Sequence, residues 1–180
     1  MIIYVMRHGE TVWNAKKITQ GISQNRLSKN GKKQAEMTAN KVKDIKFDYI
    51  VCSPLMRTVQ TANIMKKHNN AKIIKNDKII ECDQGVFTGR SKLSFSKEEI
   101  ELKNSRSKNC GMESIEKIVS RVRLFLDEIK KDYADKIVLV VTHNVIASAI
   151  ESIAKFGDFD DNVFRNKVNF DNAQIKEIEI

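Results

Sequence analysis

Three continuous apolar runs rich in β-branched residues constrain the fold of this chain most. They cover residues 2–6, 48–52 and 136–142. Because polar residues do not alternate within them, these runs are typical of strands buried on both faces. The stretches between the runs carry apolar residues at helical spacing. Buried strands alternating with helices predict an α/β fold, a three-layer α/β/α sandwich around a mostly parallel sheet.

Weaker patterns predict the remaining elements. Ile73-Ile74 and Ile79-Ile80 are expected to form short edge strands, and residues 173–180 a half-exposed strand. Ser28 and Ser53 are expected to be the N-caps of two helices. The four expected helices cover residues 28–44, residues 53 to about 67, residues 112–131, and a segment after Thr142.

Length and composition indicate a single domain over residues 1–180, because 180 residues with 41% hydrophobic content can form one core. Residues 91–111 are polar and rich in Lys and Ser. We expect them to be a mobile surface excursion that could act as a specificity loop.

The chain contains neither a secretory signal pattern nor an apolar run near the roughly 20 residues that a membrane span needs. Its cysteines, Cys52, Cys82 and Cys110, are odd in number and form no Cys-x-x-Cys pair. They exclude a disulfide framework and predict a cytoplasmic protein. Cys52 is interpreted as a small buried hydrophobe.

The net charge of +9 comes mostly from lysine. Such a surface could bind nucleic acid or steer a small anion, but a solvated lysine-rich surface is the favoured interpretation. Basic runs interleaved with aromatic residues do not occur. We therefore expect neither a nucleic acid nor a membrane as partner.

Chemically active residues follow each buried run, where ligands bind in open α/β sheets. Arg7-His8-Gly9 follows the first, residues 53–57 with Arg57 the second, and residues 142–144 with His143 the third. Arginine forks and helix N-termini bind phosphate oxygens. Gly9 is expected to let the backbone approach the ligand. This set predicts a site for a phosphoryl group.

His8 is the candidate nucleophile, since a neutral imidazole attacks phosphorus well and flanking arginines keep it unprotonated. His143 would hold the transferring oxygens. Glu81 is the candidate proton donor, because a carboxyl group beside a phosphate dianion has a raised pKa.

Several motif blocks resemble, in order, those of the histidine phosphatase superfamily and, more narrowly, its phosphoglycerate-mutase-like branch. The blocks are Arg7-His8-Gly9-Glu10-Thr11 with Trp13-Asn14 and Gln20-Gly21, Leu27-Ser28 with Gly31 and Gln34-Ala35, Ser53-Pro54-Leu55 with Arg57-Thr58 and Thr61-Ala62, Glu81 with Gly85, Phe87 and Gly89, and Gly111, Glu113-Ser114 and Arg121 with Val141-Thr142-His143. The resemblance extends from Ile2 to about Asn172 and implies a phosphoglycerate-mutase-like fold.

The resemblance also implies roles for individual residues. His8 would be the phosphorylated nucleophile, Arg7, Arg57 and His143 the phosphate pocket, and Glu81 the proton donor. Asn14 would hydrogen-bond the phosphoryl group, and the neighbouring substrate-binding residues would be Thr11, Gln20, Gly21 and Asn144. The implied reaction proceeds through a phosphohistidine without metal or cofactor, in proteins that are monomers or dimers.

Some positions depart from the family pattern. Gln24 and Arg26 replace a frequent Asp and Pro, Phe87 replaces a frequent Trp, and Asn144 stands where Gly is common. The segment between Glu81 and Gly111 is short and holds only two arginines, Arg90 and Arg106, whereas mutases carry a long insertion with substrate-binding arginines. This favours a metal-independent phosphatase for a small phosphorylated metabolite.

Three alternatives remain beside the phosphatase. A phosphoglycerate mutase would transfer the phosphoryl group rather than release it. A non-catalytic binder of phosphorylated ligands would need neither His8 nor Glu81. His8, His143 and Glu81 could instead hold zinc, although the converging arginines would repel a divalent cation.

Three acidic or aromatic residues near these motifs are given structural roles. Glu10 is expected to be the partner of a nearby donor, and Trp13 a packed aromatic. Glu113 is expected to cap the third helix.

Overall fold

A five-stranded sheet forms the centre of the computed structural model, which describes residues 1–106, 108–159 and 168–180. The strands are β1 Ile2–Arg7, β2 Tyr49–Cys52, β3 Lys72–Lys75, β4 Val138–Thr142 and β5 Ile175–Glu179. Their order across the sheet is β3-β2-β4-β1-β5. The first four strands are parallel, and β5 runs antiparallel to β1 at one edge. The predicted mostly parallel sheet is confirmed.

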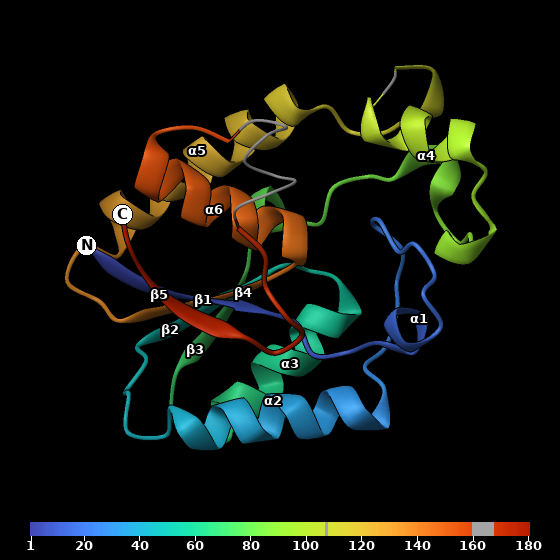
Figure 1. Ribbon diagram of the computed structural model, residues 1–180. Coiled ribbons are helices and arrows are strands. Elements are labelled where there is room, and N and C mark those ends of the chain that lie inside the picture. The colour runs from blue at the N-terminus through green and yellow to red at the C-terminus, as the bar shows by residue number, and fades with distance from the viewer. Residues whose placement is uncertain (107, 160–167) are drawn as a thin grey trace.

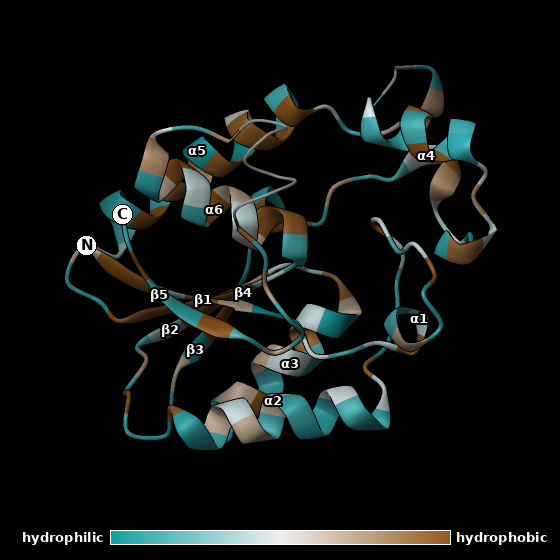
Figure 2. Cartoon of the chain, in the orientation of Figure 1, coloured by the Kyte–Doolittle hydropathy of each residue, from teal (hydrophilic) through white to brown (hydrophobic). Residues whose placement is uncertain are grey.

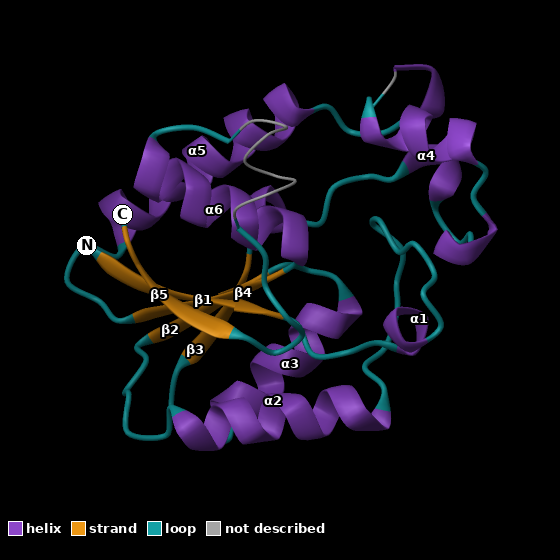
Figure 3. Ribbon diagram, viewed as in Figure 1, coloured by secondary structure: helices purple, strands orange, loops and turns teal. Residues whose placement is uncertain are grey.

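Helices cover both faces of this sheet. The α-helices in the described part are α1 Val12–Ala15, α2 Lys29–Lys41, α3 Met56–Lys66, α4 Lys97–Asn104, α5 Ile115–Asp132 and α6 Asn144–Phe156. α2 and α3 lie on one face, and α5 and α6 on the other (Figures 1 and 3). α4 stands away from the sheet, on the same side of the molecule as α1 (Figure 1). The three layers of the α/β/α sandwich are therefore present.

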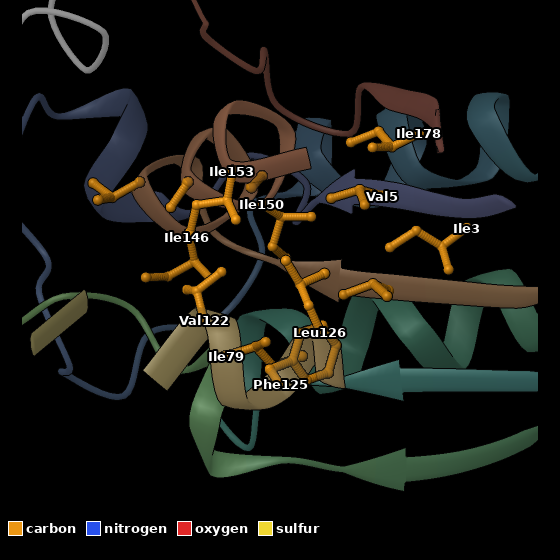
Figure 4. Packing of buried hydrophobic residues seen from close by; sticks show 14 of the residues in the cluster. Ile3, Val5, Ile79, Val122, Phe125, Leu126, Ile146, Ile150, Ile153 and Ile178 are labelled. Atoms are coloured by element: carbon orange, nitrogen blue, oxygen red, sulfur yellow. The ribbon is translucent and has the colours of Figure 1, made fainter. Parts of the chain in front are cut away.

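The larger hydrophobic core lies between the sheet and the α5–α6 layer. Val122 and Phe125 of α5 and Ile146 and Ile150 of α6 are fully buried there, together with Val5 of β1 (Figure 4). Each such side chain contributes about 1.5–3 kcal/mol by leaving water. Figure 2 shows this apolar layer, whereas α2 and α4 are mostly hydrophilic. The strong apolar stripe on α5 and α6 explains why the sequence predicted both helices.

The register of the sheet brings the functional motifs to one level. Arg7 pairs with Thr142 across β1 and β4, and Cys52 pairs with Val141 across β2 and β4. The residues that follow these strands therefore emerge side by side at the carboxyl ends. α1 and α4 lie on this side of the molecule (Figure 1). At the opposite end, the amino group of Met1 donates a hydrogen bond to Ile180 O over 3.1 Å.

The prediction of a strand at Ile79-Ile80 is wrong. Residues 77–79 form a 3₁₀ turn, which begins where the Asn76 side chain accepts a hydrogen bond from Lys78 N. Ile79 is fully buried in the core, and its carbonyl accepts from the Thr142 hydroxyl over 2.8 Å. A side chain thus satisfies this carbonyl, and no strand pairing is needed.

The expected start of the second helix is also wrong. α3 begins at Met56, its N-cap is Leu55, and the cap makes no side-chain hydrogen bond. The Ser53 hydroxyl instead contacts His143 Nε2 over 2.8 Å. The Met56 amide donates to Gln24 Oε1 over 2.9 Å, so this first amide of α3 is occupied by a side chain of the protein.

Residues 91–111 contain more regular structure than expected. Ser91 caps a 3₁₀ turn, and α4 follows with a complete capping box between Ser96 and Glu99. Ser96 Oγ accepts from the Glu99 amide, and Glu99 Oε2 accepts from the Ser96 amide. The Ser-x-x-Glu signature of this start was visible in the sequence.

None of the helices described is long and apolar enough to span a bilayer. Cys52, Cys82 and Cys110 are all free and buried. Cys52, the last residue of β2, is fully buried in the core, as predicted.

Candidate active site

A cavity of about 220 Å³ opens at the carboxyl ends of the parallel strands. Eight of the predicted site residues line it: Arg7, His8, Asn14, Gln20, Gly21, Arg57, Glu81 and Asn144. The lining also includes six residues that were not predicted from the sequence: Ile18, Thr19, Gln84, Lys92, Lys103 and Val145. Thr11 and His143 were also predicted as site residues. Neither lines the cavity, but each contacts a residue that does.

His8 is held in one tautomer at the end of β1. Its Nδ1 lies 2.7 Å from the carbonyl oxygen of Gly9. Because a carbonyl only accepts, Nδ1 carries the proton, and Nε2 of the neutral ring keeps its lone pair. Burial, followed by the charges of Arg57 and Arg7, holds the pKa of His8 well below its usual value. The ring is therefore neutral and nucleophilic at Nε2.

Arg57 is positioned by backbone carbonyls from the segment after α1. Its two terminal nitrogens donate to Ser23 O over 2.7 Å and to Gly21 O over 2.8 Å. The side chain is almost fully buried, and burial lowers its pKa to about 10, so it is still charged near neutral pH. A buried guanidinium held by neutral carbonyls keeps its charge available for an anion.

Arg7 supplies a second cation to the cavity. One terminal nitrogen donates to Phe170 O over 2.5 Å, whereas buried Nε has no hydrogen-bond partner in the described part of the chain. A buried unpaired N–H of a charged group is costly unless a ligand satisfies it. Arg7 thus brings a guanidinium with an unpaired donor to the lining of the cavity.

His143 lies beside His8 but uses both ring nitrogens within the protein. The ring centroids of the two histidines are 5.2 Å apart. Nδ1 accepts from Arg57 Nε over 3.2 Å, and Nε2 contacts the Ser53 hydroxyl over 2.8 Å. Since an arginine only donates, Nδ1 is unprotonated and Nε2 carries the proton. In this arrangement His143 positions Arg57 rather than facing the cavity.

Glu81 provides the carboxyl group of the cavity. Burial raises its pKa, against the opposing charges of Arg57 and Arg7 and a hydrogen bond from its neighbour's amide. That bond joins Cys82 N to Glu81 Oε1 over 3.0 Å. One carboxyl oxygen is therefore fixed, and the carboxyl group is poised to hold a proton.

Thr11 connects two of the lining residues. As the N-cap of α1, its hydroxyl accepts a hydrogen bond from the backbone amide of Asn14 over 2.9 Å. The same hydroxyl lies 3.0 Å from the side-chain oxygen Oε1 of Gln20. Asn144, at the start of α6, accepts from Phe170 N over 3.0 Å through Oδ1. These contacts fix the amide groups that border the cavity.

Gly9 has a different role from the one expected. A Cβ atom at Gly9 would lie 2.4 Å from Gly31 O, and one at Gly31 would lie 1.9 Å from Glu10 O. Both glycines are thus required because the loop after β1 packs directly on the backbone of α2. The predicted approach of Gly9 to a ligand is not what demands glycine here.

Residues around the site confirm one structural expectation and correct another. Glu10 accepts from the Ser28 hydroxyl over 2.6 Å, as predicted for a structural partner. Glu113 does not cap α5, because Ser114 is the cap. Glu113 instead forms a two-pronged ion pair with Arg121, at 2.8 and 3.0 Å.

The cations that residues 91–111 contribute to the cavity are lysines. Arg90 pairs with Glu99 at 2.6 Å, and Arg106 donates to Glu113 O over 2.8 Å. Neither arginine lines the cavity, whereas Lys92 and Lys103 do. The sequence does not distinguish these two lysines from the others, because isolated lysines in a lysine-rich chain carry no pattern of their own.

The arrangement combines a neutral imidazole, two guanidinium groups and a carboxyl group around one small space. It suits attack on a group that carries negative charge on several oxygens, followed by protonation of the leaving oxygen. Among the residues described, no group of three or more His, Cys, Asp or Glu is placed to hold a metal ion, and this includes His8, His143 and Glu81.

Comparison with known proteins identifies relatives over most of the chain. The sequence matches the model of the histidine phosphatase superfamily (branch 1) over residues 3–180. Phosphoserine phosphatase 1 of Hydrogenobacter thermophilus is 33% identical over 149 residues, which cover 79% of this chain and 71% of the relative. The uncharacterized phosphatase PhoE of Bacillus subtilis is 31% identical over 156 residues, covering 87% and 78%.

The fold is similar to that of solved structures. A phosphoglycerate mutase from Bacillus anthracis superposes with a TM-score of 0.80, at 24% sequence identity, over 98% of this chain and 86% of the mutase.

Proposed function

The chain belongs to the histidine phosphatase superfamily (branch 1) and is an enzyme of the phosphatase type, and we propose that it hydrolyses small phosphomonoesters without a metal, through a phosphohistidine on His8. One observation carries the proposal. His8 Nδ1 is tied to Gly9 O at 2.7 Å, which leaves the Nε2 lone pair available in a cavity lined by Arg7, Arg57 and Glu81.

In the first half-reaction, His8 Nε2 attacks the phosphorus atom of the bound ester. The new N–P bond forms as the bond from phosphorus to the leaving oxygen breaks. Protonated Glu81 gives its proton to that oxygen, so an alcohol leaves. Arg7 and Arg57 stabilise the negative charge on the three remaining phosphoryl oxygens. His143 holds Arg57 in place, and Asn14 hydrogen-bonds the phosphoryl group.

In the second half-reaction, water replaces the alcohol. The Glu81 carboxylate takes a proton from the water as the water oxygen attacks phosphorus and the N–P bond breaks. Inorganic phosphate is released, His8 becomes neutral again, and Glu81 is protonated for the next cycle.

We propose a small substrate because the cavity is small. Its volume of about 220 Å³ is below the about 300–1,000 Å³ typical of pockets for drug-sized ligands. Gln20, Gly21 and Asn144 would border the substrate with Asn14, and Thr11 would hold Asn14 and Gln20 in place. We further propose that residues 1–180 act as one domain, with 91–111 as its specificity segment, and that three free buried thiols suit a cytoplasmic setting.

A phosphoglycerate mutase is the second candidate, because the fold is similar to that of the Bacillus anthracis mutase. The short segment between Glu81 and Gly111 favours hydrolysis, since neither of its arginines lines the cavity. Without such arginines, fewer cations retain the leaving part of the substrate while water competes for the phosphohistidine.

The test is phosphate release from a panel that includes phosphoserine, 3-phosphoglycerate and sugar phosphates, with EDTA present. Wild type is compared with His8→Ala and with His68→Ala, which changes the histidine beyond the end of α3. We expect turnover that survives EDTA, persists in His68→Ala and is lost in His8→Ala.

Two further measurements separate the alternatives. Acid-labile labelling of wild type by ³²P-substrate, absent in His8→Ala, would support the phosphohistidine. Interconversion of 2- and 3-phosphoglycerate without phosphate release would indicate a mutase. Binding without turnover or label would indicate a non-catalytic binder, and loss of activity in EDTA would overturn the metal-free mechanism.

A further inference from the structure

Lys103 extends from α4 into the cavity that holds His8 and Arg57. Its ammonium group donates a hydrogen bond to the Gln84 side-chain oxygen. It also lies 5.1 Å from the ring centre of Phe87 and 5.9 Å from that of Phe95. The neutral amide and the two aromatic faces hold the ammonium in place, as in cation–π sites.

This ammonium has no carboxylate partner in the described part of the chain, although it is half-buried. The neighbouring cation of the same segment, Arg90, is paired with Glu99. Burial, followed by the charges of Lys92 and Arg106, lowers the pKa of Lys103 to about 8, so it is still mostly charged at pH 7. A partly desolvated, unpaired charge is stabilised when a ligand brings the opposite charge.

Gln84 links Lys103 to the acid end of the site. Its Oε1 accepts from Lys103, and its Nε2 contacts Cys82 Sγ over 2.9 Å. Cys82 directly follows Glu81 and fixes that carboxyl group through its amide. Lys103 therefore belongs to the wall that carries Glu81, where the leaving part of a substrate would lie.

We propose that Lys103, with Lys92 beside it, binds a second anionic group on the substrate, so that the preferred substrates are phosphomonoesters carrying a carboxylate or a second phosphate. This rests on the proposed function, in which Arg7 and Arg57 bind the reacting phosphoryl group. Ile18 and Val145 line the same cavity and would contact a short carbon skeleton joining the two anions.

The test measures binding in a His8→Ala background by titration calorimetry, so that no substrate is consumed. One matched pair is 3-phosphoglycerate and glycerol 3-phosphate, which differ by a carboxylate. The other is the bisphosphate and the monophosphate of propane-1,3-diol. We expect the ligand with two anionic groups to bind about tenfold more tightly in at least one pair, and the pair identifies which anion is recognised.

Three variants assign this preference to one residue. In Lys103→Met the two ligands of a pair should bind about equally, whereas Lys103→Arg should retain the preference for the ligand with two anionic groups. Lys97→Met removes a solvent-exposed lysine from the same helix, outside the cavity, and should leave it unchanged. Equal melting temperatures of Lys103→Met and Lys97→Met would exclude unfolding as the cause.

The proposal is overturned if neither pair shows a preference, or if the preference persists in Lys103→Met. Failure of the proposed function looks different, since it would appear as loss of phosphohistidine labelling or turnover in the protein with an intact His8. The two results come from separate proteins and separate measurements.

Discussion

Arg57 Nε lies 3.2 Å from His143 Nδ1, and this contact determines which nitrogen of His143 carries its proton. The proton is on Nε2, which lies 2.8 Å from the Ser53 hydroxyl. Ser53 and His143 follow β2 and β4, so the register of two strands sets the position of a guanidinium bound at Gly21 and Ser23. The sheet thus orients Arg57 through a buried serine.

Ser53→Ala tests whether the contacts from Ser53 through His143 position Arg57. Without the hydroxyl, Nε2–H is buried and unpaired, and a tautomer change would direct a proton at Arg57. We expect kcat to fall roughly tenfold or more, with stability lower by about 1–3 kcal/mol. Steady-state kinetics and urea unfolding measure the two effects.

The control is Ser152→Ala in α6. Ser152 is also fully buried, but its hydroxyl has no hydrogen-bond partner among the residues described. It should leave kcat unchanged. Equal effects of the two substitutions on kcat would contradict a role of Ser53 in positioning Arg57.

Glu81→Gln tests the proton donor. Because burial raises the pKa of Glu81, the acid form is present below that pKa, and the rate should fall as pH rises through it. Glu81→Gln should lose this pH limb and reduce kcat/KM, which reports the first half-reaction, by about 10²–10⁴ for alkyl phosphates. The kcat/KM for para-nitrophenyl phosphate, whose leaving group needs no proton, should be much less affected.

Glu99→Gln is the matched control, because Glu99 pairs with Arg90 outside the cavity. It should keep the wild-type pH profile. An equal loss of kcat/KM for both leaving groups in Glu81→Gln would show that the residue is needed for binding or folding rather than for proton donation.

Gly21→Ala tests the loop that holds Arg57. Gly21 has φ +51°, and an added Cβ would lie 2.9 Å from Thr88 Oγ1 and 3.1 Å from Gln84 N. Gly157, at the end of α6, has φ +77° with open space around it. Both substitutions should cost about 1–2 kcal/mol of stability from the left-handed backbone. Only Gly21→Ala should also raise KM, because it displaces the carbonyl that binds Arg57.

The buried strands and the main site residues could be predicted from the sequence for one physical reason. A strand buried on both faces is a continuous apolar run, and the residues at its carboxyl end have a known destination. Arg7, His8 and Arg57 therefore needed no long-range information. Glu81 was selected as the carboxyl group after the short apolar run Ile79-Ile80, and the resemblance implied the same role, although no local pattern determines where its loop folds.

Lys103 could not be predicted, because its position depends on how α4 folds back over the loop of Phe87. The capping box from Ser96 to Glu99 was present in the sequence but did not lead to a predicted helix, because no periodic apolar stripe follows it. Ser53 was misassigned as an N-cap for a related reason. Its partner, His143, lies 90 residues away in the sequence.

Glu151→Ala tests a polar anchor of the edge strand. This carboxylate of α6 is almost fully buried and accepts from Lys155 over 2.5 Å and from Lys176 of β5 over 2.7 Å. Burial alone would raise its pKa, but the bonds from the two lysines bring the pKa below its ordinary value. Its contribution to stability is therefore present above the unfolded-state pKa and lost as pH falls through the folded one. We expect Glu151→Ala to lower the free energy of unfolding by about 1–3 kcal/mol at pH 7 and by less at acid pH. Urea unfolding measures this loss, and Glu179→Ala, at an exposed position, is the control.

The pH dependence of substrate affinity tests Lys103 independently of its removal. With its pKa at about 8, Lys103 is charged below that pH and loses its charge as pH rises. Lys92, Arg106 and the thiols of Cys82 and Cys110 are the ionisable groups around it that influence this pKa. KM for a phosphorylated carboxylic acid should therefore rise from pH 7 to pH 9, whereas KM for an analogue without the carboxylate, such as glycerol 3-phosphate, should change little. In Lys103→Arg the guanidinium stays charged throughout this range, so the rise should disappear while the preference for the acid remains. A rise of equal size in Lys103→Arg would assign the titration to another group.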